Sequence, residues 1–284
     1  MSTSENVYSA SVSRDGRQSV TGFAGSLVRP LIFAALLGGV LAGFAAHRTY
    51  GTIPFTGTKI ARPELSEKAK KETEENWATM KFSDDVYAEK VNSVNVGHSR
   101  DSAVALGLAG LILGGAFGLA AAWGAGRRVT GVIAGLLQGV IIGSIGGLIA
   151  GQCAMAFKIL LDEKFRKGPT TPRDLAGRWL TELYTSVAVH ATVWCLLGIG
   201  LTIVVILARG SMKSAAQKLL AGVIAGIAGA AAYTPVSAIF FSNLNSGMPL
   251  PEGFFNAVAF MVIASLMIAI FIGREAAVRA DSIK

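Results

Sequence analysis

The distribution of charge along the 284-residue chain restricts its fold more than any other feature. Six long apolar runs contain none of the 26 basic and 18 acidic side chains. Each run approaches or exceeds the roughly 20 residues that cross the hydrocarbon core of a bilayer. A soluble core does not require such sorting, whereas one charge at the bilayer centre costs about 2.5 to 3.5 kcal/mol. We therefore expect an all-α, polytopic helical membrane protein with about six transmembrane helices.

The six runs divide the chain into spans and connecting segments. The expected order is a cytoplasmic tail, a first span, an extracytoplasmic segment with a surface helix, a glycine-rich two-span hairpin, a connecting loop, a second hairpin, and a last span with a cytoplasmic tail. The corresponding ranges are 1–29, 30–46, 47–101, 102–157, 158–182, 183–241 and 254–284. The first span also has the length of a signal sequence, but Phe44 disfavours cleavage after Ala46, so we expect a retained anchor.

The charges of the short loops indicate that both termini are cytoplasmic. In that orientation the cytoplasmic pieces carry 11 basic and four acidic residues, and the short outer loop 242–253 has no lysine or arginine. The outer segment 47–101 is also rich in basic residues, but a segment of this length is translocated largely regardless of charge. Only the basic loop 158–182 opposes this orientation. The expected localisation is the cell membrane, with several passes.

A surface helix is predicted within residues 62–80, in the outer segment. Glu64 and Lys68, and Glu67 and Lys71, are spaced to form ion pairs along such a helix. The apolar stripe is weak, so we expect a solvated helix that leans on the outer ends of the bundle; a docking helix and a helix on the membrane surface are the alternatives.

Glycines at four-residue intervals are the sharpest pattern in the sequence. The third span contains a row of six, the second a row of three and the fifth a pair: Gly131, Gly135, Gly139, Gly143, Gly147 and Gly151; Gly110, Gly114 and Gly118; Gly222 and Gly226. Glycine lets helix backbones approach closely, so these rows predict glycine-zipper packing. The partner helix is expected within the same subunit, and oligomerisation through the same rows is the alternative.

An internal repeat is suggested by TGVIAG at residues 130–135 and AGVIAG at residues 221–226. The offset of 91 residues also aligns Gly107 with Gly198, so the two hairpins would be parallel repeats, as in some transporters.

Few polar side chains lie inside the predicted spans. The candidates for an intramembrane role are Gln138, Ser144, Gln152, His190, Tyr233 and Thr234. No carboxylate is among them, although ion-coupled transport usually recruits one. Pro235, next to Thr234, predicts a kink or a broken helix. Ser144 and His190 lie at similar depth, the minimum arrangement for intramembrane hydrolysis.

Motifs for cofactors, metals and nucleic acid are missing from the sequence. Cys153 and Cys195 lie in apolar runs without the spacing of a metal site, and no nucleotide-binding glycine motif is present. We expect no enzyme activity and no cofactor. The predicted function is a non-catalytic subunit or scaffold of a membrane assembly, with a channel or transporter for a small solute as the alternative and an intramembrane serine hydrolase third. Expected partners are the lipid bilayer and either other membrane subunits or a second copy, but not nucleic acid.

Overall fold

The computed structural model describes residues 19–281 apart from residues 53–55, 57, 77–80, 166–173, 211, 213 and 242–246. These residues form seven helices and no strand. The helices are α1 (Ser19–Thr49), α2 (Glu67–Glu75), α3 (Asp84–Gly124), α4 (Val129–Phe165), α5 (Asp174–Arg209), α6 (Ala215–Phe240) and α7 (Phe254–Asp281). All except the short α2 are long and apolar enough to cross a membrane, which confirms the predicted six-span, all-α class.

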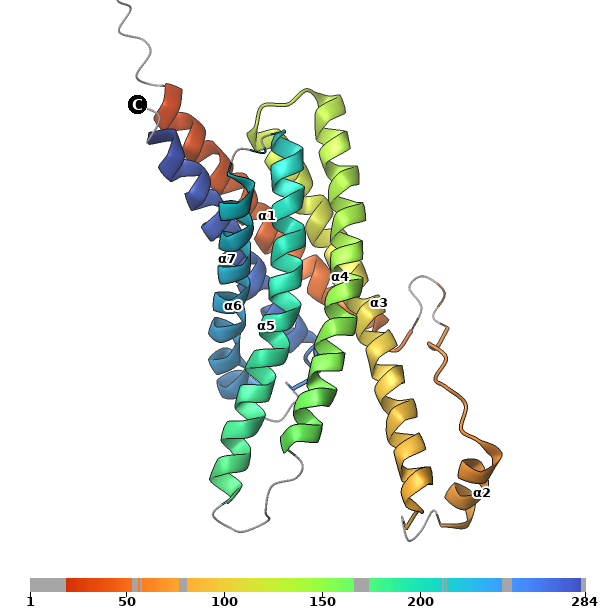
Figure 1. Cartoon of the computed structure of the whole chain (residues 1–284). Coiled ribbons are helices and arrows are strands. Elements are labelled where there is room, and N and C mark those ends of the chain that lie inside the picture. The colour runs from red at the N-terminus through yellow and green to blue at the C-terminus, as the bar shows by residue number, and fades with distance from the viewer. Residues whose placement is uncertain are drawn as a thin grey trace, which may run out of the picture.

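Five of the six long helices close into a ring, in the spatial order α1, α3, α5, α6 and α7, with α7 packed back on α1. α4 lies outside this ring and packs against α3 and α5. Figure 1 shows the beginning of α1 and the end of α7 at one end of the bundle, and α2 beyond the other end. The ring therefore has one peripheral helix and one appended segment.

Among the described residues most buried positions are small, and three of the four fully buried large aromatic side chains lie where α5, α6 and α7 meet. Trp194, Tyr233 and Phe260 are fully buried there, and Phe117 of α3 is buried in the same core. Elsewhere buried alanines and glycines keep helix axes close together. Packing in a bilayer depends on such close contact, since lipid tails are as apolar as leucine.

The glycine rows of α3 and α4 lie against each other in antiparallel register. The facing pairs are Gly110 with Gly143, Gly114 with Gly139, and Gly118 with Gly135. A methyl group added at Gly139 would overlap the carbonyl oxygen of Gly114, and one added at Gly135 would lie 2.8 Å from the carbonyl oxygen of Gly118. Within the single chain, α3 therefore lies against the face of α4 that carries these glycines.

The ends of the α4 row have different neighbours. Gly147 lies against Leu106 and Gly107, and Gly151 lies against Ala103. At Gly131, in contrast, the atoms nearest to an added methyl group belong to the side chain of Arg127. The other five glycines of the row have α3 atoms among their nearest neighbours.

The two hairpins have different registers, which contradicts the predicted repeat. On α6, Gly222 lies against Gly198 of α5, and Gly226 lies against the backbone of Trp194. An offset of 91 residues would pair Gly107 with Gly131, but Gly107 lies against Leu148 instead. The matching hexapeptides therefore arise from similar composition and do not mark equivalent positions.

Candidate functional site

The most distinctive feature outside the bundle is the first half of α3. The helix has 41 residues, which at about 1.5 Å per residue is about 60 Å, or roughly twice the thickness of the bilayer core. Its apolar half begins at Ser102, and residues 84–101 carry charges. This charged half diverges from the other long helices, with α2 beside it (Figure 1). We call α2 together with residues 84–101 the arm.

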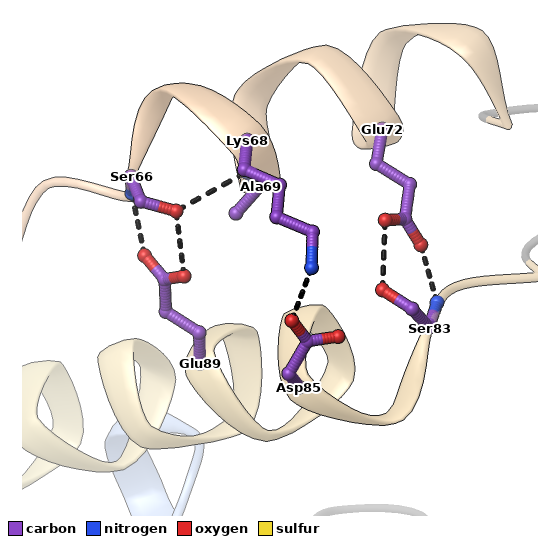
Figure 2. Close-up of polar contacts among 7 residues, drawn as sticks. All are labelled: Ser66, Lys68, Ala69, Glu72, Ser83, Asp85 and Glu89. Carbon is purple, nitrogen blue, oxygen red and sulfur yellow. Dashed lines mark hydrogen bonds and ion pairs between the residues drawn. The ribbon is translucent and has the colours of Figure 1, made fainter.

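Each helix of the arm is capped by a glutamate of the other, as Figure 2 shows. Ser66, the N-cap residue of α2, donates from its backbone N–H and its hydroxyl to the Glu89 carboxylate, at 2.5 and 2.8 Å. Ser83, the N-cap residue of α3, donates in the same way to Glu72, with the hydroxyl bond at 2.7 Å. The Ser66 hydroxyl also accepts the N–H of Ala69 at 3.2 Å. These reciprocal bonds satisfy backbone donors that a helix start leaves open.

An ion pair between Lys68 and Asp85 lies between the two caps (Figure 2). The Lys68 ammonium, followed by the hydroxyl of Ser83, holds the pKa of Asp85 at about 2, below its ordinary value of 3.8. Hydrogen bonds from the backbone and side chain of Ser66 lower the pKa of Glu89, and the bond to Asp85 raises the pKa of Lys68. Both carboxyl groups therefore hold the arm together in their charged form.

The base of the arm is held by hydrogen bonds to the irregular segment 61–66, which precedes α2. The Ser93 hydroxyl donates to the Pro63 carbonyl at 2.9 Å, and the Arg100 guanidinium donates to the Ala61 carbonyl at 2.8 Å. The Arg62 side chain lies over Gly97, where an added methyl group would come within 3.1 Å of it. The chain from Ala61 onward therefore runs along α3 as far as the start of α2.

Three predictions about this segment need correction. Lys68 pairs with Asp85 of α3, and not with Glu64, because α2 begins only at Glu67. Glu67 pairs with Lys70 at 2.8 Å, and not with Lys71. α2 also packs against the arm half of α3 and does not lean on the ends of the bundle. Residues 77–80 of the predicted surface helix lie outside the described residues.

One face of the arm is apolar and uncovered. Tyr87 is 49% exposed and Val94 is 42% exposed, and the half-buried Val91 lies between them at helical spacing. Asp85 and Glu89, which bond to Lys68 and Ser66, lie on the opposite side of the helix, so the stripe points away from α2. Tyr87, Val91 and Val94 together form what we call the outer stripe.

A second cluster of polar groups lies inside the bundle, around the predicted candidate His190. Its Nε2 bonds to the carbonyl oxygen of Met248 at 3.0 Å, so this nitrogen carries the proton. The ring packs edge-on against Tyr233, with centroids 5.2 Å apart, and against Phe260 at 4.8 Å. Met248 and Leu250 are buried, so the loop before α7 enters the end of the bundle. His190 therefore ties this loop to α5.

Tyr233 is the second predicted candidate in this cluster. Its hydroxyl donates to Oδ1 of Asn256 at 2.5 Å, and Ser237 donates to the same oxygen at 3.4 Å. Asn256 is fully buried at the start of α7. These bonds join α6 to α7 as His190 joins α5 to the preceding loop.

Within the described part of the chain, two nitrogen atoms of the cluster have no hydrogen-bond partner, namely Nδ1 of His190 and Nε1 of Trp194. Because Nε2 of His190 faces a carbonyl oxygen, its Nδ1 is an acceptor in the neutral ring, whereas Trp194 offers a donor. The two side chains lie four residues apart on one face of α5. This pair presents one unpartnered acceptor and one unpartnered donor inside the described part of the bundle.

The other predicted polar residues are scattered. The Thr234 hydroxyl donates to the Ala230 carbonyl at 2.9 Å, and α6 continues through Pro235, so the helix is not broken there. Gln152 accepts from Ser99 at 2.6 Å at the end of the apolar part of α4. Gln138 is exposed on the outer face of α4.

Ser144 is not brought together with His190. Its hydroxyl donates to the Ile141 carbonyl of its own helix at 3.0 Å, while His190 bonds to Met248. Both cysteines are free, and among the described residues no three His, Cys, Asp or Glu side chains gather in one place.

Sequence reasoning missed Ser66, Glu72, Ser83, Glu89, Asn256 and Met248. Ser66 followed by Ala69 at position N3 lacks the glutamate of a capping box, so only the folded chain shows that Glu89 takes its place. Asn256 was visible as a single amide at the start of the last apolar run.

Comparison of the chain with protein-family models, with curated proteins and with solved structures found no match.

Proposed function

We propose that the protein is a non-catalytic subunit or scaffold of a membrane assembly, and that the arm is the part that contacts a soluble or extramembrane partner. The observation that carries this proposal is that α3 runs without a break from the arm into the bundle. A partner bound to the arm would therefore be connected through α3 to the bundle, because α3 packs against α1, α4 and α5.

The contacts of the arm support a docking role. Its two caps and its ion pair bring the two helices together before any partner binds, which lowers the entropic cost of binding. The outer stripe supplies an apolar and aromatic surface of the kind that interfaces use, with Tyr87 as its largest side chain.

Purification in mild detergent tests this function. We expect a stoichiometric partner to co-migrate with the wild-type protein and to be lost from the Tyr87→Ala and Val94→Ala variants. Lys71→Ala is the matched control, because Lys71 is an exposed arm residue that lies outside the stripe. If the wild-type protein purifies without a partner, or if both stripe variants retain the partner, the proposal is contradicted.

We further propose that both termini are cytoplasmic, so that the arm is extracytoplasmic, and that the glycine rows act as glycine zippers. Because six spans are an even number, both termini lie on the same side of the membrane. The start of α1 and the end of α7 lie at the same end of the bundle in Figure 1. The short-loop charges select the cytoplasmic side for them. The antiparallel contact of the α3 and α4 glycines supports the zipper.

A channel or transporter for a small solute is the second candidate, and the unpartnered pair in the bundle favours it. Nδ1 of His190 and Nε1 of Trp194 would bind a small polar molecule that both accepts and donates a hydrogen bond. Flux of such solutes into liposomes containing the purified protein distinguishes the two functions. A scaffold gives no flux above that of empty liposomes, whereas a transporter gives flux that His190→Phe abolishes.

A further inference from the structure

α4 is the least covered helix of the bundle. Only 22% of its apolar window is buried inside the chain, compared with 39 to 67% for the other five spans. The glycine row of α4 faces α3, so the opposite side of α4 faces outward. That outward side is where a neighbouring membrane helix has room to pack.

The outward side of α4 has the period of a helix-packing seam. Its residues are spaced alternately by four and three positions and are exposed, although the last two also contact Gly107 and Ser99 of α3: Ala134, Gln138, Ile141, Ile145, Leu148 and Gln152. This is the a and d pattern of two helices packed at a small crossing angle. We call these six residues the α4 seam.

Gln138 is the residue of the seam whose side chain is unfavourable in contact with lipid. It lies ten residues after Arg128, which is about 15 Å along the helix and thus near the middle of a core about 30 Å thick. Within the described part of the chain no hydrogen bond joins its amide to another residue, whereas Gln152 of the same seam accepts from Ser99. An unpaired amide in hydrocarbon is unfavourable, and a neighbouring helix that pairs with it removes the cost.

We propose that the α4 seam is the interface of a parallel homodimer, in which the Gln138 amides of two copies pair across a two-fold axis. Two copies inserted in the same orientation are related by an axis along the membrane normal, so α4 packs parallel to α4 and each a or d residue meets its own copy. A glutamine amide has one partially negative oxygen and one partially positive N–H₂ group. Its charges therefore complement those of an identical amide, which favours a second copy over an unrelated apolar helix.

This interface is separate from the arm and does not depend on the scaffold function. It also differs from oligomerisation through the glycine row, because α3 of the same chain occupies that row. The seam supplies aliphatic contacts through Ile141, Ile145 and Leu148, which are 58, 50 and 43% exposed in the single chain.

Oxidative cross-linking in membranes tests the homodimer, with Cys153 and Cys195 replaced by alanine. A single cysteine introduced as Ile141→Cys or Ile145→Cys should give a covalent dimer of twice the chain mass. Ile133→Cys is the matched control, because Ile133 is 51% exposed but lies outside the seam. Equal cross-linking at position 133, no cross-linking at 141 and 145, or a product with a different protein would overturn the proposal.

The role of Gln138 is tested in the Ile145→Cys background. Gln138→Leu should weaken dimerisation about 3- to 30-fold, as expected for loss of interhelical amide bonds in a membrane, and Gln138→Asn should preserve most of it. Ser144→Ala is the control, since the Ser144 hydroxyl already bonds within its own helix and its loss should leave the cross-linked fraction unchanged. Unchanged cross-linking by Gln138→Leu would show that the amide does not hold the dimer. Thermal unfolding of each variant in detergent confirms that the chain is folded.

Discussion

Single glycine positions decide how closely α3 and α4 approach. At Gly114 and Gly139 each backbone carbonyl lies where the other residue would place a methyl group. Gly146, on the same helix, is different, because an added methyl group would meet only the Cα of Gly200 at 3.9 Å. Gly139 and Gly146 thus have the same intrinsic helix propensity but different surroundings. A comparison of substitutions at the two positions therefore separates the effect of packing from the effect of helix propensity.

Gly139→Ala should lower the thermal stability of the protein, whereas Gly146→Ala should leave it unchanged or raise it. Overpacking a fitted contact costs about 1 to 3 kcal/mol, and alanine is favoured over glycine in a helix by about 1 kcal/mol. At Gly139 the first effect dominates, because the clash is with backbone. At Gly146 only the second operates.

Melting of the purified variants in one detergent measures the difference. If Gly139→Ala melts at or above the temperature of Gly146→Ala, close backbone contact between α3 and α4 does not hold the bundle together.

The spacing of the glycines predicted close packing, but not its limits. Gly131 belongs to the same row as Gly139, yet it lies beside the turn, where the Arg127 side chain covers it. Similarly, the sequence indicated His190 as an intramembrane candidate but did not indicate its partner. The partner is the carbonyl of Met248, 58 residues away, and sequence periodicity carries no information about such a distant contact.

At the scale of single elements, the arm forms because the short α2 and the charged half of α3 cap each other. α2 has only nine residues, and an isolated helix of this length is marginal in water. The carboxylates of Glu72 and Glu89 each satisfy a cap of the other helix, and Asp84 and Asp85 lie favourably in the first turn of α3.

Removal of a cap should loosen α2 without affecting the bundle. Ser66→Ala removes the bonds of its hydroxyl to Glu89 and to the N–H of Ala69, and N-cap losses of this kind cost about 0.5 to 2 kcal/mol. Hydrogen exchange should become faster in residues 67–75 and stay the same in α6. Lys71→Ala serves as the control, because its contact with Glu75 is long, at 3.9 Å, and exposed. Equal exchange in the two variants would show that the cap does not hold α2.

Acid should open the arm. The pKa of Asp85 is about 2 instead of 3.8, and that of Glu89 lies below 4.5, so both groups stabilise the arm at pH values above their ordinary pKa. This stabilisation is lost as the pH falls through the lowered values. A spin label at Lys70→Cys should therefore gain mobility between about pH 4 and pH 2, and a label at Trp123→Cys should not.

Asp85→Asn should remove much of this pH dependence, because it removes the carboxylate that pairs with Lys68. A label at position 70 whose mobility is the same at pH 4 and pH 2 would contradict the role of these carboxylates.

The arm was also the element that the sequence predicted least well. Residues 84–101 are polar and have no strong apolar period, so the sequence predicts them as part of the segment before the second span, although α3 begins at Asp84. The helix continues there because it extends a span, begins with two acidic residues and packs against α2. Only the first two of these features can be read from the sequence, and neither predicts the partner of Lys68.

At the scale of the whole molecule, the charge distribution predicted the number of spans because the cost of a buried charge in lipid outweighs local preferences. It did not predict the ring, nor the position of α4 outside it, since helix neighbours depend on steric fit. Orientation is a property of the loops, and single-cysteine labelling with an impermeant reagent measures it.

In a background without Cys153 and Cys195, cysteines near Glu67 and Ser246 and at Lys164 should react from outside, and cysteines near Arg128, Lys213 and Arg279 should react only after permeabilisation. This outcome follows from the lysine and arginine residues of the short loops. Labelling of position 213 in intact cells would reverse the orientation and place the arm in the cytoplasm.

The central structural claim is that α3 is one continuous helix that connects the arm rigidly to the bundle. Spin labels at Val94→Cys and Trp123→Cys, both at exposed positions of α3, measure this directly in nanodiscs. Their backbones are 29 residues apart, so a continuous helix predicts a single narrow distance distribution near about 44 Å. A broad distribution, or one centred well below this value, would show that α3 bends or breaks where it leaves the membrane and that the arm moves independently.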